Sequence, residues 1–259
     1  MIEHVSVSSL KLHAYSPKKW VLEYLEGLRP PPTKHLEFGS LVHSAIEDLY
    51  VGKSVEGEHK GFFEQWKGDN EHWFKLPDWK IENEFKVWLD LELPLFKGRI
   101  DMWRMEKNEQ VFQIHVVDHK TVTSGYELSA SALKKDWQLS LYCVALNPYI
   151  LKEKDARIKA AAVSHNQLFK SREFDLIGYD LVTAELTAGD ILRNIEEIKE
   201  EARKVLQTIS TYDKLGFEAV DLGQAKQKYY GKPDLHWPVL SGKVSLEEFK
   251  KTWRKIDEV

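Results

Sequence analysis

The stretch GRIDMWRMEKNEQVFQIHVVDHKT, residues 98–121, places two carboxylates and one ammonium at the ends of adjoining strand-like segments. Asp101 ends one apolar-flanked run, and Asp118 and Lys120 end the next. Residues two apart on a strand face the same side, so Asp118 and Lys120 point together while His119 points away. If the two strands pair, Asp101 meets Asp118 at the edge of the sheet. Neighbouring carboxylates repel each other and raise one pKa unless a cation lies between them.

A divalent cation at this edge would supply a specific chemistry. Mg²⁺ takes oxygen ligands, commonly one or two carboxylates together with water and phosphate oxygens. Lys120 could then contact the attacking water or the phosphate, so these residue types suit cleavage of a phosphodiester. The alternative is a solvated surface pair of little energetic value, because a D-x-K tripeptide occurs by chance in many chains. Apolar residues at positions 114, 116 and 117 favour the first interpretation, since they place Asp118 at the end of a buried strand.

Periodicity along the chain predicts the elements that must position these residues. Apolar residues at helical spacing behind serine caps indicate helices, and alternating or continuous apolar runs indicate strands. The resulting order predicts a mixed α/β fold around a small sheet. The expected helices are residues 6–27, 37–50, 132–147, 186–209 and 245–256, and the expected strands are two within 79–106 and one each at 111–121, 156–165 and 171–180.

Composition limits the classes of protein that this chain can form. It has 259 residues, a net charge of −4, 42% hydrophobic and 30% charged residues, which is ordinary globular composition. One cysteine, Cys143, excludes structural disulfides within the chain and an all-cysteine metal site. No stretch approaches the ~20 apolar residues of a membrane span, and the N-terminus lacks an apolar signal region. We therefore expect a soluble cytoplasmic protein, whose mild acidity is compatible with a DNA enzyme that is basic only in its cleft.

Four short motifs together resemble one known family. The chain is similar to the RecB-like branch of the PD-(D/E)xK nuclease superfamily over about residues 6–165. The resemblance implies a restriction-endonuclease-like α/β core, with a central mixed sheet flanked by helices. The motifs, in family order, are GSLVHSAIE with His43 and Glu47, GRID with Asp101, VVDHKT with Asp118 and Lys120, and QLSLY with Gln138 and Tyr142.

The resemblance also implies roles for these residues. It makes Lys120 the residue that orients or deprotonates the attacking water, with Mg²⁺ or Mn²⁺ as the cofactor. Glu47 lies one helical turn from His43 and can address the same site. Gln138 and Tyr142 would border the site, although Tyr142 could instead pack its helix on the sheet. The implied metal ligands are His43, Asp101, Asp118 and the backbone carbonyl of His119.

The chain departs from the family pattern where many relatives hold an iron–sulfur cluster. The N-terminal stretch reads SPKKW, with Ser16 where a cysteine would stand, and the C-terminal segment QAKQKYYGKPDLHWPVLSG has no cysteine. We therefore predict no iron–sulfur cluster. We expect a single nuclease domain over residues 1–259, with a core at about 36–180 and the segments 1–35 and 181–259 packing on it.

These features predict a metal-dependent deoxyribonuclease, with an exonuclease of recombination or repair, phage-encoded or from a mobile element, as the favoured form. One alternative is a structure-specific or single-strand endonuclease that uses the same site. Another is a catalytically silent DNA-binding subunit. The expected partners are single- or double-stranded DNA ends, with a single-strand annealing or recombination partner and a homo-oligomer also allowed, and no membrane.

Overall fold

The computed structural model describes residues 2–75, 78–108, 111–151, 157–226, 228–229 and 232–254. The chain divides into two compact units. We call Pro32–Val87 with Lys97–Ile195 the site unit, and Met1–Pro31 with Trp88–Phe96 and Glu196–Val259 the terminal unit. The single nuclease domain expected from the sequence stays a prediction. None of the described helices is long and apolar enough to cross a membrane.

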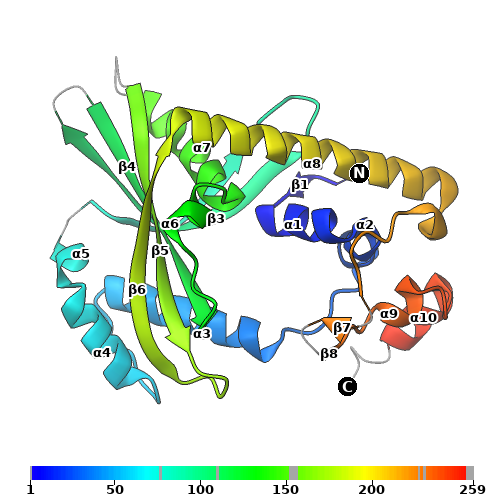
Figure 1. Ribbon diagram of the computed structural model, residues 1–259, viewed down its shortest axis with the longest axis horizontal. Helices are drawn as coiled ribbons and strands as arrows, with labels where there is room; N and C mark the ends of the chain where they lie inside the picture. Colours follow the sequence, from blue (N-terminus) through cyan, green and yellow to red (C-terminus); the bar gives the residue numbers. More distant parts are fainter. Residues whose placement is uncertain are drawn as a thin grey trace. The chain divides into compact units, whose positions relative to one another are not determined.

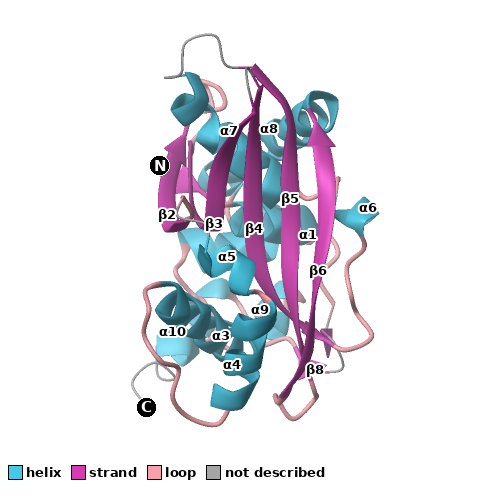
Figure 2. Ribbon diagram, turned by 90° about the vertical axis from the view of Figure 1, so that its left-hand side faces the viewer, coloured by secondary structure: helices cyan, strands magenta, loops and turns pink. Residues whose placement is uncertain are grey.

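The site unit is built on a mixed sheet, as Figure 2 shows. Neighbouring strands are antiparallel for β3–β4, parallel for β4–β5 and antiparallel for β5–β6, while β2 pairs with β3. This arrangement confirms the predicted α/β class with a central mixed sheet. The strand bounds are β2 Lys80–Val87, β3 Leu95–Asn108, β4 Val111–Thr123, β5 Arg157–Lys170 and β6 Leu176–Thr187.

Helices cover both sides of this sheet. Figure 1 shows α4 and α5 on one side and α6 and α7 on the other. Helix α3 begins after Thr33, whose side chain accepts a hydrogen bond from the Leu36 backbone, and its buried face packs into a core with α4, Met102 and Val117. The helix bounds are α3 Lys34–Tyr50, α4 Lys60–Asp69, α5 Glu71–Lys75, α6 Ala130–Leu133 and α7 Trp137–Leu151.

The start of α7 is fixed by Asp136, whose Oδ1 accepts hydrogen bonds from the backbone nitrogens of Gln138 and Leu139. This cap satisfies donors that would otherwise have no helical partner. The helix then continues through the Asn147–Pro148 pair, where the sequence predicted its end. A proline inside a helix removes one N–H donor, but α7 still forms its last turn and ends at Leu151.

The terminal unit combines both ends of the chain. Its strand β1, His4–Val5, pairs in parallel with Leu95 and Phe96 at the start of β3. Inside this unit, His13 forms a buried pair with Glu201, and Lys19 forms one with Asp234. Its other elements are α1 Val7–Tyr15, α2 Pro17–Trp20, the π-helical turn Val21–Leu25, most of α8 Ala188–Leu215, the 3-10 turn Phe217–Ala219, β7 Lys228–Tyr229, β8 Lys232–Pro233, α9 Trp237–Leu240 and α10 Leu246–Arg254.

Ser16 connects the two terminal segments of this unit through hydrogen bonds. Its side chain is fully buried, accepts from the Lys19 backbone and donates to the Leu222 carbonyl at 2.6 Å. Gly223 lies beside it with a φ of +63°, and an added Cβ would come within 2.7 Å of the Tyr15 carbonyl oxygen. The position at which the resemblance implies a cluster cysteine in many relatives therefore carries a hydrogen-bonded hydroxyl.

Replacing this hydroxyl is expected to weaken the terminal unit. Ser16→Ala leaves the half-buried Leu222 carbonyl without its donor, which should cost about 0.5–1.5 kcal/mol of unfolding free energy. Urea unfolding followed by circular dichroism measures the change. Ser241→Ala is the matched control, because its hydroxyl is exposed and its hydrogen bond to the Pro238 carbonyl is 3.3 Å long. Equal losses of unfolding free energy in the two variants would show that the Ser16 hydrogen bond stabilises the unit no more than an exposed one.

Candidate active site

The antiparallel pairing of β3 with β4 brings the two carboxylates of the site together. Met102 lies opposite Val117, so the next position along the ladder sets Asp101 beside Asp118. Asp101 is 8% exposed and Asp118 1% exposed, and the His119 backbone N–H donates to Asp101 Oδ2 at 2.8 Å. Burial, with the added charge of Asp118, raises the pKa of Asp101 to about 8. This part of the site therefore disfavours a second negative charge unless a cation lies beside it.

Lys120 lies on the same face of β4 as Asp118, as the period of the strand predicted. Its Nζ is 2.6 Å from Asp118 Oδ2, and His165 on β5 has Nε2 at 3.5 Å from the same oxygen. Burial acts to lower the pKa of Lys120, but the charge and hydrogen bond of Asp118 outweigh it and the pKa is raised. Lys120 is therefore held as an ammonium directly beside the buried carboxylate.

Helix α3 presents His43 to the carboxylates. His43 Nδ1 lies 3.6 Å from Asp101 Oδ2, and the side chain is about one-third exposed. Burial lowers the pKa of His43, so the imidazole is neutral at neutral pH and its nitrogen lone pair is available to a metal ion. The predicted juxtaposition of this helix and the strand ends is thus present in the structure.

The structure adds Glu82 of β2 to this group, a residue that sequence reasoning missed. One ligand atom from each of His43, Glu82 and Asp101 lies within 4.8 Å of the others. Glu82 has a φ of +51°, uncommon for a residue other than glycine, and its carboxylate pairs with Arg99 Nε at 2.7 Å. Such backbone strain is often found at functional sites. The only signal in the sequence was an acidic residue in a strand pattern, which is too common to single out.

Glu47, in contrast, is exposed and lies outside the group of three potential ligands. Its influence on the site is electrostatic. Burial raises the pKa of Glu82, Arg99 opposes this, and the charge of Glu47 adds to the increase. Its predicted catalytic role stays a prediction.

Gln138 and Tyr142 lie one turn apart on α7 and reach the site from the opposite side. Gln138 Nε2 donates to Asp118 Oδ1 at 3.0 Å, and its Oε1 accepts from Lys120 Nζ at 3.4 Å. The Tyr142 hydroxyl accepts from Gln138, and its buried ring packs edge-on against Phe85 of β2. Gln138 therefore orients both Asp118 and Lys120, while Tyr142 both supports Gln138 and packs the helix on the sheet.

His119 points to the opposite face of β4 from Lys120, where its ring packs edge-on against that of His43 at 6.1 Å between centroids and contacts a buried polar cluster. Its Nδ1 accepts from Asn166 Nδ2 at 2.9 Å, and Asn166 Oδ1 accepts from Trp66 Nε1 at 3.4 Å. Burial lowers the pKa of His119 to about 3, so the ring is neutral. The side chain of His119 therefore holds β4 against this cluster, while its backbone N–H reaches Asp101.

The residues present fit a divalent cation. The buried Asp101, whose pKa is raised, gains from a positive charge placed beside it, and a neutral imidazole completes a mixed oxygen and nitrogen donor set. His43, Glu82 and Asp101 are spaced to share one ion, with Asp118 and Lys120 adjoining them.

Metal binding is expected to release a proton from Asp101. Because the pKa of this carboxyl is about 8, it is mostly protonated at pH 7 without metal and must ionise to become a ligand. We expect Mn²⁺ affinity to rise nearly tenfold per unit between pH 6 and 7.5 and to level off above pH 8. Calorimetry at each pH, in buffers of different ionisation enthalpy, measures both affinity and proton release. A flat affinity profile without proton release would contradict the assignment of Asp101 as a ligand.

Comparison with known proteins gives a family match over most of the chain. Residues 4–219 match the model of a family described as the PD-(D/E)XK nuclease superfamily. No curated protein matches the sequence significantly. Among solved structures, a protein called SSO0001 aligns with 14% identity and a TM-score of 0.37 over 76% of this chain and 75% of its own. A phage related exonuclease from Haemophilus somnus 129PT aligns with 14% identity and a TM-score of 0.36 over 80% of this chain and 96% of its own.

Proposed function

The chain belongs to the PD-(D/E)XK nuclease superfamily, and from this premise we propose that it is a divalent-metal-dependent deoxyribonuclease. The observation that carries the proposal is the meeting of two buried carboxylates, Asp101 and Asp118, with the ammonium of Lys120 at 2.6 Å from the second. A structural ion pair would need only one carboxylate. The second carboxylate, with the neutral His43 beside it, is the arrangement expected where a cation and a phosphate bind.

In the proposed mechanism the residues of the site divide the work. The ion would be held by His43, Glu82, Asp101, Asp118 and the His119 carbonyl. When bound, Mg²⁺ or Mn²⁺ would lower the pKa of the attacking water and neutralise charge on the phosphate oxygens. Lys120 orients this water or donates to the phosphate oxygen on which charge develops. Gln138 holds the Lys120 ammonium and the Asp118 carboxylate in fixed positions through its two hydrogen bonds.

Within this activity we favour an exonuclease that serves recombination or repair and is encoded by a phage or mobile element. The support is the four-motif resemblance. A structure-specific or single-strand endonuclease with the same site is the second candidate. A silent DNA-binding subunit is less well supported, because such a protein has no need for Lys120 beside a full ligand set.

An assay on end-labelled DNA tests the proposal. Linear and circular forms, single- and double-stranded, are incubated with Mg²⁺, Mn²⁺ or EDTA. A metal-dependent exonuclease shortens linear DNA from its ends, leaves circles intact and is inactive in EDTA. Cleavage of circles would support the endonuclease, and binding to DNA without cleavage under any metal would support the silent subunit.

A further inference from the structure

The loop of residues 124–129 connects two elements that carry the site. It follows β4, which bears Asp118 and Lys120, and leads through α6 to α7, which bears Gln138. Its first part is a tight turn, in which the Tyr126 backbone N–H donates to the Thr123 carbonyl at 3.1 Å. Gly125 has a φ of +91°, as the third position of a type II turn requires. The start of the loop therefore has a defined conformation.

The end of this loop is held on the face of the sheet that carries the site. Gln167 of β5 is fully buried and pairs in register with Lys120, so the two side chains share a face. Gln167 Oε1 accepts from the Leu128 N–H at 3.0 Å, and its Nε2 donates to the Leu128 carbonyl at 2.9 Å. Because paired strands lie only about 4.8 Å apart, these bonds hold the Leu128 backbone close to the row that contains Lys120.

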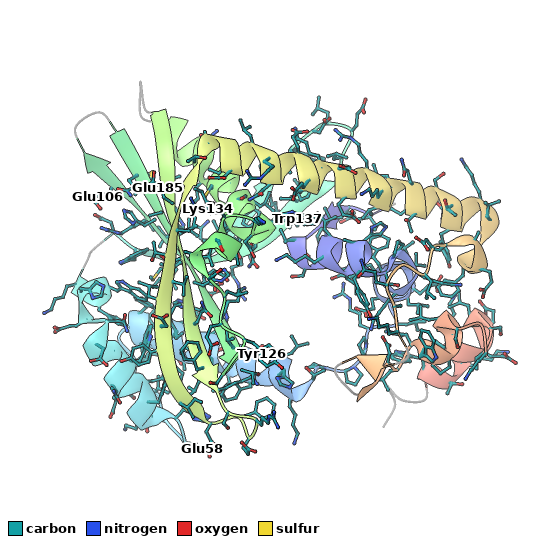
Figure 3. All side chains as sticks on the ribbon, viewed as in Figure 1. Glu58, Glu106, Tyr126, Lys134, Trp137 and Glu185 are labelled. Atoms are coloured by element: carbon teal, nitrogen blue, oxygen red, sulfur yellow. The ribbon has the colours of Figure 1, made fainter. Side chains whose placement is uncertain are left out.

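This fixed loop exposes a large aromatic side chain. Tyr126 is 74% exposed, and Leu128 nearby is 40% exposed. Figure 3 labels Tyr126 on the loop at the end of the sheet where β4 finishes. An unpaired base has a π face that can cover an exposed ring, and such stacking tolerates any base. Bases inside a duplex are already stacked and offer no such face without the cost of unstacking.

We propose that Tyr126 is a stacking surface for an unpaired base of the strand whose phosphate lies at Asp118 and Lys120. The chemical class of ligand is single-stranded DNA, including the frayed end of a duplex. The inference rests on the proposed function, because it assumes that a DNA strand lies on the site face of the sheet. Tyr126 then contributes to the choice of substrate, and the metal ligands contribute to its cleavage.

Binding measured without cleavage tests this role. Fluorescein-labelled oligothymidylate is titrated with the full chain in EDTA and followed by anisotropy. Tyr126→Ala should weaken binding by about 5- to 100-fold, the range for loss of one base–aromatic stack, and Tyr126→Phe should stay within about twofold of the wild type. Ile177→Ala is the matched control, since Ile177 is 58% exposed on β6 and should leave binding unchanged. Thermal unfolding of each variant should match that of the wild type.

A second oligonucleotide separates stacking from phosphate contacts. An oligomer of abasic sites keeps the phosphates but lacks the bases, so wild type and Tyr126→Ala should bind it equally. Oligothymidylate binding that is unchanged in Tyr126→Ala, or a loss of the same size on the abasic oligomer, would overturn the proposal. Cleavage with Mn²⁺ is scored separately. A wild type that stacks bases but never cleaves would refute the nuclease function alone, and an active Tyr126→Ala with unchanged binding would refute the stacking role alone.

Discussion

Replacing Lys120 with alanine is expected to lower DNA cleavage by about 10²–10⁴-fold, the range for a positioned proton-transfer or electrostatic group. The ammonium lies 2.6 Å from Asp118 Oδ2 and cannot ligate a cation, so its proposed work is on the attacking water or the developing phosphoryl charge. Its loss should therefore act on the transition state and hardly on ground-state binding. Single-turnover cleavage with Mn²⁺ measures the effect.

Two further variants make the Lys120 result specific. Lys75→Ala removes an exposed lysine of α5 and should leave cleavage unchanged. Lys120→Arg keeps the charge but should not restore activity, because the planar guanidinium fork is bulkier than the compact ammonium and cannot take its place beside Asp118. DNA affinity in Ca²⁺ should change little in Lys120→Ala, since many phosphate contacts share that energy. Near wild-type cleavage by Lys120→Ala would make Lys120 a structural or binding residue.

The second large effect is expected at the carboxylates. Asp101→Asn and Asp118→Asn preserve side-chain shape but remove the negative charge that a divalent ion requires. Mn²⁺ affinity should fall at least about tenfold in each variant and cleavage by about 10³-fold or more, because the ion both binds substrate and stabilises the transition state. Calorimetry and the cleavage assay measure the two quantities. The exposed Glu64→Gln of α4 is the matched loss of one negative charge.

The isosteric change matters for the Asp118 variant. Truncation to alanine would remove the carboxylate that contacts both Lys120 and the buried His165 and would leave a cavity, so the variant could lose stability as well as metal binding. The asparagine keeps a side-chain oxygen for these contacts. Wild-type Mn²⁺ affinity in both asparagine variants would remove Asp101 and Asp118 from the ligand set.

The local features of this site could be predicted because they depend on short-range periodicity. The two-residue period of β4 places Asp118 and Lys120 on one face and His119 on the other, as the contacts of these residues confirm. The helical spacing around His43 likewise predicted a core-facing helix. The pairing of β3 with β4 is only a condition at the level of the sequence, and the structure shows that the two strands pair antiparallel.

What escaped prediction depends on long-range pairing. Glu82 reaches the group because β2 pairs with β3 and because its own backbone takes a positive φ, and neither fact is visible in IENE. Asn166 and Gln167 meet His119 and the 124–129 loop only through the parallel pairing of β4 with β5, whose connection passes through α7. The sequence pointed to Glu47, because its helical spacing from His43 is visible. It did not point to Glu82, because the strand that pairs with β3 cannot be identified from the sequence.

The most direct test of the account joins metal binding to catalysis in one titration. Cleavage of end-labelled DNA and calorimetric occupancy are measured with wild-type protein over the same range of Mn²⁺ concentration. Activity should rise with occupancy of a site that depends on Asp101 and Asp118, and EDTA should abolish both. Cleavage that persists in EDTA, or a saturated metal site without cleavage of any DNA, would contradict a metal-dependent nuclease.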